Sequence, residues 1–152
     1  MKGTLAVLAI LLASGLEAAD WPQWRGPGRD GTIPGLAARG DWPASLTPGW
    51  KVKVGEGHAS PVVVGDRVYV FSREGEDEVV RALKLPTGET IWRQAYPAPY
   101  EMNSAAFDHG KGPKGTPVVA DGRVCALGIS GILSCWDAGD GRPRWRKEFA
   151  SQ

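Results

Sequence analysis

An internal repeat limits the possible folds of this chain more than any other feature of its sequence. The first copy begins with SPVVVGDRVYVFS at Ser60 and ends with LPTGETIW at Trp92. The second copy begins with TPVVADGRVCALG at Thr116 and ends with DAGDGRPRW at Trp145. The copies match in the order of their apolar runs, their turn residues and their closing tryptophan. The chain is therefore built from equivalent units rather than from one irregular domain.

Each copy reads as four short strands. Apolar and β-branched runs alternate with Gly, Asp and Pro, and no long segment beyond the amino terminus has a helical period. Four-stranded units that repeat about every 40 to 50 residues are typical of β-propellers, in which small twisted sheets stack around an axis. We therefore predict an all-β fold, a β-propeller of four-stranded blades. The chain supplies about two complete blades and part of an earlier one, whose closing strand is WKVKVGEGHASP from Trp50.

The closing motif of each unit pairs a glycine with a tryptophan, Gly88 with Trp92 and Gly141 with Trp145. Glycine adopts the positive φ of a tight turn without steric cost. A flat indole has enough area to fill the wedge between two neighbouring blades. We therefore predict that these four residues, together with Asp137 of the second copy, form a structural repeat motif.

Three regions are predicted along the chain. Residues 1–19 read as a signal peptide, because a positively charged start precedes an apolar run that is too short for a stable transmembrane helix. An uncleaved anchor is the alternative, and the cleavage position is left open. Residues 20–49 form an amino-terminal segment, and residues 50–152 form an incomplete propeller. The signal peptide predicts a periplasmic or secreted protein without a transmembrane span after cleavage.

The amino-terminal segment is rich in tryptophan, with Trp21, Trp24 and Trp42. Exposed indoles can stack against sugar rings, but packing against a blade explains them more simply. We therefore expect these three side chains to pack the segment onto the propeller.

The charges of the chain are nearly balanced, with 18 Lys and Arg against 17 Asp and Glu. Binding to nucleic acid or to an anionic membrane surface needs a basic excess, so we predict neither. Arg142, Arg144 and Arg146 alternate along the last strand and are predicted to share one solvated sheet face. Function is expected from shape and from individual sites, with a protein or a small molecule as the ligand.

Two cysteines, Cys125 and Cys135, flank a predicted hairpin in a compartment that allows disulfides. A three-residue loop in this hairpin would place them opposite each other, whereas a two-residue loop would shift them out of register. A disulfide and two separate buried thiols are therefore both consistent with the sequence.

The blade endings resemble those of the pyrroloquinoline-quinone-like repeat family, whose units end in a pattern close to AxDxxTGxxxW. The two copies are ALKLPTGETIW, with Lys84 in the place of the aspartate, and CWDAGDGRPRW, which keeps Asp137. The stretch DWPQWRGPGRDGT from Asp20 is similar to the segment that precedes the propeller in secreted bacterial proteins of this group. The resemblance implies a ring with more blades than this chain supplies. The chain is therefore expected to be part of a longer protein or to associate with other chains.

Three classes of protein share this repeat. For quinoprotein alcohol dehydrogenases, the resemblance implies pyrroloquinoline quinone held with calcium, a catalytic aspartate and often a disulfide between adjacent cysteines. For the outer-membrane protein assembly lipoprotein, it implies a scaffold without quinone and a lipidated cysteine after the signal peptide. The sequence shows neither set of features, so we assign no catalytic residue and predict the third class, an exported binding or scaffolding module. A fragment of a quinone-dependent dehydrogenase and an assembly-factor-like scaffold are the alternatives.

An insertion between the two complete copies is the predicted place for a binding site, because long loops on rigid scaffolds often carry function. It contains Glu101, Asn103, His109 and Lys111, and His58 precedes the first complete copy. Oxygen ligands and a histidine could hold a divalent cation, but their spacing matches no metal motif, so no metal site is predicted. These five residues are the candidates for cofactor or ligand binding, and an ordinary solvated loop is the alternative.

Overall fold

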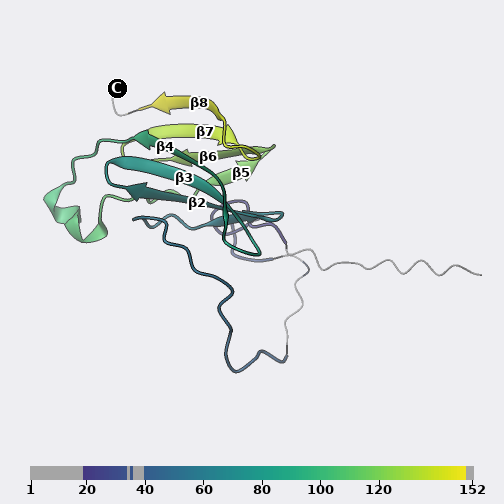
Figure 1. Ribbon diagram of the computed structural model, residues 1–152. Helices are drawn as coiled ribbons and strands as arrows, with labels where there is room; N and C mark the ends of the chain where they lie inside the picture. The colour runs from purple at the N-terminus through teal and green to yellow at the C-terminus, as the bar shows by residue number, and fades with distance from the viewer. Residues whose placement is uncertain (1–18, 34, 36–39, 150–152) are drawn as a thin grey trace, which may run out of the picture.

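The structure is a computed structural model that describes residues 19–33, 35 and 40–149 (Figure 1). The predicted signal peptide therefore lies outside the described residues, apart from Ala19. The described residues form two four-stranded antiparallel sheets, with the strand orders β1-β2-β3-β4 and β5-β6-β7-β8. This architecture confirms the predicted all-β fold with two four-stranded blades. No helix of the described part combines the length and the apolar character that a bilayer span requires.

Each blade is a meander in which strands that follow one another in sequence also pair. Blade 1 contains β1 (Val62–Val64), β2 (Arg67–Glu74), β3 (Asp77–Lys84) and β4 (Thr90–Pro97). Blade 2 contains β5 (Val118–Ala120), β6 (Arg123–Leu127), β7 (Ile132–Asp137) and β8 (Pro143–Glu148). A 3-10 helix, η1 (Ser104–His109), lies in the connection between the blades.

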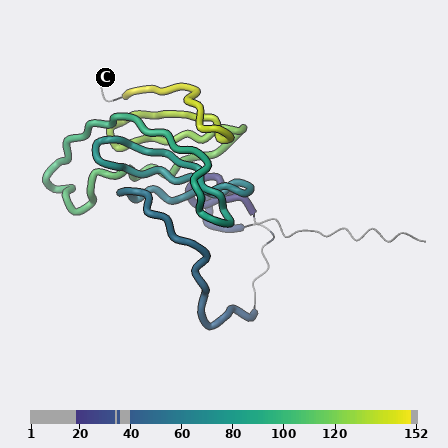
Figure 2. The backbone as a smooth tube through the Cα atoms, in the orientation of Figure 1, coloured from purple at the N-terminus to yellow at the C-terminus, as the bar shows by residue number. Residues whose placement is uncertain are grey.

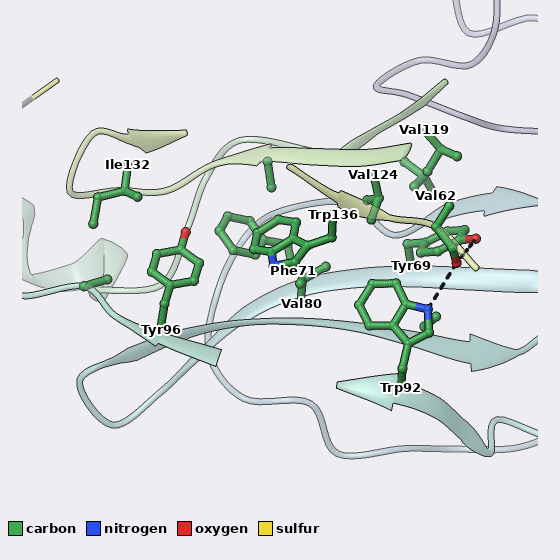
Figure 3. Packing of buried hydrophobic residues seen from close by; sticks show 14 residues of the cluster. Val62, Tyr69, Phe71, Val80, Trp92, Tyr96, Val119, Val124, Ile132 and Trp136 are labelled. Atoms are coloured by element: carbon green, nitrogen blue, oxygen red, sulfur yellow. Dashed lines mark hydrogen bonds between the residues drawn. The ribbon is translucent and has the colours of Figure 1, made fainter. Parts of the chain in front are cut away.

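The two blades pack face to face and share one apolar core (Figure 3). Tyr69 and Phe71 stand two residues apart on β2 and both enter this core, because side chains alternate between the faces of a strand. Burial of apolar surface is the main free-energy term that holds the blades together. The core consists of Val62, Tyr69, Phe71, Val80, Ala82, Trp92, Tyr96 and Ala98 from blade 1 and the residue after it, and of Val119, Val124, Ala126, Ile132, Trp136 and Ala138 from the strands and the β7–β8 turn of blade 2.

The amino-terminal segment joins the inner strands of both blades. The blades approach each other at β1 and β5, which makes these the inner strands. Trp21 and Val63 exchange two backbone hydrogen bonds, with N···O distances of 2.7 and 2.9 Å. The next residue, Pro22, accepts a hydrogen bond from the backbone N–H of Val119 at 2.8 Å. Figure 2 shows this segment, in purple, beside the blades.

The tryptophans of this segment do not all pack as expected. The ring of Trp21 lies against Gly26, where an added Cβ would come within 2.7 Å of it. Trp24 and Trp42 are 58% and 70% exposed, so the expectation that they pack onto a blade is wrong. Directly after Trp24 the chain reverses, with positive φ at Arg25 and Gly26. This reversal leaves the indole of Trp24 in solvent, with the Arg25 guanidinium 5.4 Å from its ring centroid.

The closing tryptophan of blade 1 lies on the closing glycine of blade 2. The indole Nε1 of Trp92 donates a hydrogen bond to the backbone oxygen of Ala138 at 3.1 Å (Figure 3). A Cβ added to Gly141 would come within 2.6 Å of the same indole, and Gly141 has a φ of 75°. Glycine is therefore required twice at this position, by the turn and by the indole that covers it.

The same arrangement occurs one unit earlier. The indole Nε1 of Trp50 donates to the backbone oxygen of Leu85 at 2.8 Å, and a Cβ on Gly88 would come within 2.6 Å of its ring. Trp50 therefore takes the place of a closing tryptophan before blade 1. The residues from 50 to 61 contain no strand, only an isolated bridge between Glu56 and Arg73. The predicted closing strand is thus not formed, because no further strand of its own unit lies beside it in the described residues.

The two cysteines face each other across the β6–β7 hairpin. The register pairs Cys125 with Cys135 and Leu127 with Leu133. The backbone N–H of Gly128 then bonds to the oxygen of Ile132 at 2.9 Å, which leaves a three-residue loop. This is the loop length that places the cysteines opposite each other, and the structure joins them in a disulfide.

Reduction of this disulfide should lower the free energy of unfolding by about 2–3 kcal/mol, because the bond closes only a short loop in the unfolded chain. Urea unfolding with and without a thiol reductant measures the effect. A double variant, Cys125→Ala with Cys135→Ala, is the control and should not respond to the reductant. An unchanged unfolding midpoint of the unaltered protein in reductant would contradict the expectation.

Candidate functional site

The connections of the two blades separate into two ends. The β2–β3 turn and the start of the connection between the blades lie together, because the N–H of Ala98 bonds to the oxygen of Glu76 at 3.0 Å. At the opposite end, the N–H of Leu85 in the β3–β4 turn bonds to the oxygen of Asp66 in the β1–β2 turn at 2.8 Å. The insertion therefore belongs to the first end, from which η1 projects beyond the sheets (Figure 1).

The projecting part of the insertion is capped at both ends of η1. The side-chain oxygen of Asn103 accepts a hydrogen bond from the N–H of Ala105 at 3.0 Å, as an N-cap residue does. After the helix, the N–H of Gly110 bonds to the oxygen of Phe107 at 3.1 Å. No residue of η1 is buried, and Phe107 is 62% exposed. The insertion therefore presents an aromatic side chain to solvent on a locally ordered turn.

The second half of the insertion is fastened to the segment before β1. The backbone N–H groups of His58 and Ala59 both donate to the oxygen of Pro113, at 2.9 and 3.2 Å. The ring Nε2 of His58 lies 3.0 Å from the backbone oxygen of His109. A Cβ on Gly112 would come within 2.5 Å of the backbone of Gly57, so the two chain segments touch backbone to backbone.

The structure gives most of the predicted candidates local partners instead of a shared site. Asn103 caps η1, and His58 is bonded to the backbone of His109. The ammonium of Lys111 lies 3.6 Å from a carboxylate oxygen of Glu76, and the two side chains are 40% and 69% exposed. Glu101 lines a separate groove of about 410 Å³ between the start of the insertion and the β6–β7 turn. No three His, Cys, Asp or Glu side chains gather into a possible metal site within the described residues.

The described residues also do not fit a site for pyrroloquinoline quinone with calcium. The cysteines form a cross-strand bond between β6 and β7 rather than a bond between neighbours in sequence. The inner strands β1 and β5 already bond to Trp21 and Pro22. No cluster of carboxylates for a calcium ion is present in the part of the chain that is described. We therefore derive no quinone chemistry from these residues.

A second groove, of about 330 Å³, lies on the outer side of the molecule between β4 and β8. Ala95 of β4 lines one wall, and Ser134, Trp136, Arg144 and Arg146 line the other with their neighbours on β8. The sequence predicted Arg142, Arg144 and Arg146 only as a solvated face. The sequence does not predict that Arg146 of blade 2 stacks on Tyr96 of blade 1. The repeat relates equivalent positions of the two copies, and these two residues are not equivalent.

Two titratable groups near this groove have shifted pKa values. The Arg144 guanidinium and the backbone N–H of Gly139 both donate to Asp137, and they lower the pKa of its carboxyl. Burial raises the pKa of the Tyr96 hydroxyl, and its hydrogen bond to Glu78 acts in the same direction. Asp137 therefore stays ionised and pairs with Arg144, while Tyr96 stays neutral.

The comparisons with known proteins place the chain in one family. Residues 76–152, half of the chain, match the family model described as outer membrane protein assembly factor BamB. This match confirms the resemblance to the quinoprotein-type repeat that the blade endings predicted. The assembly factor is one of the alternatives that the sequence predicts, and the repeat units match its family.

Individual relatives cover only part of the chain. The outer membrane protein assembly factor BamB of Burkholderia pseudomallei (strain K96243) is 34% identical over 71 residues, which is 47% of this chain and 18% of that protein. A crystal structure of BamB from Moraxella catarrhalis is 26% identical, with a TM-score of 0.46, over 64% of this chain and 28% of that one. A europium-containing methanol dehydrogenase is 25% identical, with a TM-score of 0.44, over 62% of this chain and 16% of that one.

This chain spans about a fifth of the length of the curated relative from Burkholderia, 18%. The matched residues contain β3, β4 and the whole of blade 2, so the shared feature is the repeat unit itself. The chain belongs to the family described as outer membrane protein assembly factor BamB.

Proposed function

We propose that this chain is part of an exported β-propeller scaffold that binds proteins during the assembly of outer-membrane proteins. The observation that carries the proposal is the family match over β3, β4 and blade 2. The relatives that share it are named outer membrane protein assembly factors. The predicted signal peptide supports a place on the periplasmic side of the envelope. The remaining blades would come from a longer chain or from association.

The insertion supports a binding role for one end of the blades. Its second half is fastened to the segment before β1, so little ordering cost remains when a partner binds. Its first half presents Phe107, which is 62% exposed. Aromatic side chains, phenylalanine included, are enriched at protein interfaces, and a preformed loop presents them at a low entropy cost. We therefore assign the partner-binding surface to the end that carries η1.

A photocrosslinking amino acid placed at Phe107 tests this assignment in the cell that makes the protein. The matched control is the same amino acid at Thr87, in the β3–β4 turn at the opposite end. We expect Phe107 to crosslink to one or a few envelope proteins that mass spectrometry identifies, and Thr87 to give much less product. Equal products from the two positions, or crosslinks only to cytoplasmic proteins, would contradict the proposal.

A direct assay separates the scaffold from a dehydrogenase. Pyrroloquinoline quinone and calcium are added to the purified chain while tryptophan fluorescence and dye reduction with alcohols are followed. We expect neither saturable quenching nor turnover, because the described residues do not supply the donor set. Tight quinone binding with turnover would overturn the scaffold proposal.

A further inference from the structure

The outer groove between β4 and β8 contains a guanidinium without an acidic partner. Arg142 pairs with Asp140 and Arg144 pairs with Asp137, at N···O distances of 2.7 and 2.5 Å. Arg146 follows these two arginines on β8. It forms no ion pair within the part of the chain that the structure describes. Among the cations that line the groove, Arg144 and Arg146, it is therefore the one without an ion pair.

Two buried side chains hold the Arg146 guanidinium in place. Its Nε donates to the hydroxyl oxygen of Ser134 at 2.8 Å, and Ser134 is 1% exposed. Its Cζ lies 4.0 Å from the ring centroid of Tyr96, which is 2% exposed. Tyr96 is fixed in turn, since its hydroxyl donates to the buried carboxylate of Glu78 at 2.7 Å. These contacts use the Nε–H and one face of the guanidinium, so its terminal N–H groups are available to a ligand.

The groove that Arg146 lines, of about 330 Å³, is suited to a side chain with one negative charge. The other cation in the groove, Arg144, is already neutralised by Asp137. A single uncompensated guanidinium balances one carboxylate, whereas a doubly charged phosphate would leave negative charge unpaired. Trp136 and Pro143 add apolar walls beside the guanidinium. All residues that line the groove belong to the two described blades.

We propose that this outer groove binds a glutamate or aspartate side chain of an extended partner peptide, with Arg146 as the group that recognises the carboxylate. The inference extends the proposed scaffold function, because it names the chemistry of a bound segment. The site is distinct from the insertion, since it lies on the outer strands rather than at the end that carries η1.

Two matched peptides test the carboxylate. N-acetyl-Ala-Glu-Leu-amide and N-acetyl-Ala-Gln-Leu-amide are titrated into the purified chain while backbone amide shifts are followed by two-dimensional NMR. We expect saturable shifts at Ser134 and Arg146 with the glutamate peptide, and binding about tenfold weaker or more with the glutamine peptide, since a charge-assisted bidentate pair is lost. Binding of the glutamate peptide should also weaken as salt is raised. Equal affinity for both peptides, or tighter binding of inorganic phosphate, would overturn the proposal.

Variants of neighbouring arginines identify the residue. Arg146→Gln should weaken binding of the glutamate peptide by about tenfold or more, because it removes the groove guanidinium that has no carboxylate partner. Arg146→Lys should retain part of the affinity, because it keeps the charge but not the planar fork. Arg142→Gln is the matched control and should bind like the unaltered protein. Urea unfolding shows that each variant is folded, and full affinity in folded Arg146→Gln would contradict the inference.

The result of the peptide-binding experiments on the groove is independent of the result of the crosslinking at Phe107. A failure of the groove experiment with specific crosslinks at the insertion would remove the groove and leave the scaffold proposal in place. Carboxylate binding without crosslinks would retain the groove and move the partner surface to the outer strands.

Discussion

Replacing Trp92 by alanine should lower the free energy of unfolding by about 3–5 kcal/mol, the range observed when large aromatic side chains are removed from a core. Trp92 is 8% exposed and fills the space between the two blades. Its loss would leave a cavity beside Tyr69, whose ring centroid lies 6.0 Å away. It would also remove one hydrogen-bond donor from the backbone oxygen of Ala138. Urea unfolding followed by circular dichroism measures the change.

Trp145 provides the matched control for this prediction. It stands in the equivalent place of the second copy, but it is 47% exposed, and no closing glycine of a following unit lies among the described residues. Trp145→Ala should therefore cost much less in this chain, about 1 kcal/mol or below. Equal losses in the two variants would contradict the view that the closing tryptophan stabilises a blade through the next blade.

Gly141→Ala should lower the free energy of unfolding by about 2–5 kcal/mol, because two separate costs add at this residue. The φ of 75° is unfavourable for any side chain, and the new Cβ would come within 2.6 Å of the rigid indole of Trp92. The indole cannot move aside without losing its hydrogen bond to Ala138. The same urea experiment measures this loss.

Gly122→Ala separates the two costs. Gly122 has a similar φ of 69°, but an added Cβ would find no atom within 4 Å. It should therefore lose only the backbone term of about 1–2 kcal/mol. If Gly141→Ala costs no more than Gly122→Ala, the indole does not constrain the glycine, and the proposed inter-blade lock is wrong.

The fold could be predicted because the repeat consists of local sequence patterns. The turns at Gly65 and Gly88, the apolar runs and the closing tryptophans each determine a few neighbouring residues. Two copies with the same pattern must form the same sheet, and their shared apolar face then requires them to stack. For this reason the four-stranded blades could be predicted without knowledge of any contact between distant residues.

The candidate sites were harder to predict because they depend on contacts between residues that the repeat does not relate. Arg146 reaches Tyr96 across the interface, and Ser134 orients it from the neighbouring strand. His58 meets the backbone of His109 only because the insertion folds back onto the segment before β1. Side-chain chemistry suggested a role in cofactor or ligand binding for the histidines, whereas the path of the backbone decides which groups meet. No local pattern encodes that path.

The bonds from Trp21 to β1 and from Pro22 to β5 constrain the order in which this chain can fold. A long segment without a repeat pattern separates Trp21 from its partner Val63. Pro22 is separated from its partner Val119 by blade 1 and the insertion as well. Contacts between residues far apart in sequence are slow to form, because the closure of a long loop costs entropy before any bond forms. The bond from Val119 to Pro22 therefore forms only after blade 1, the insertion and β5 have been synthesised, whereas the Trp21 bonds need only β1. Before these bonds form, the inner edges of β1 and β5 are open to pairing with other chains, a hazard that is typical of unprotected sheet edges.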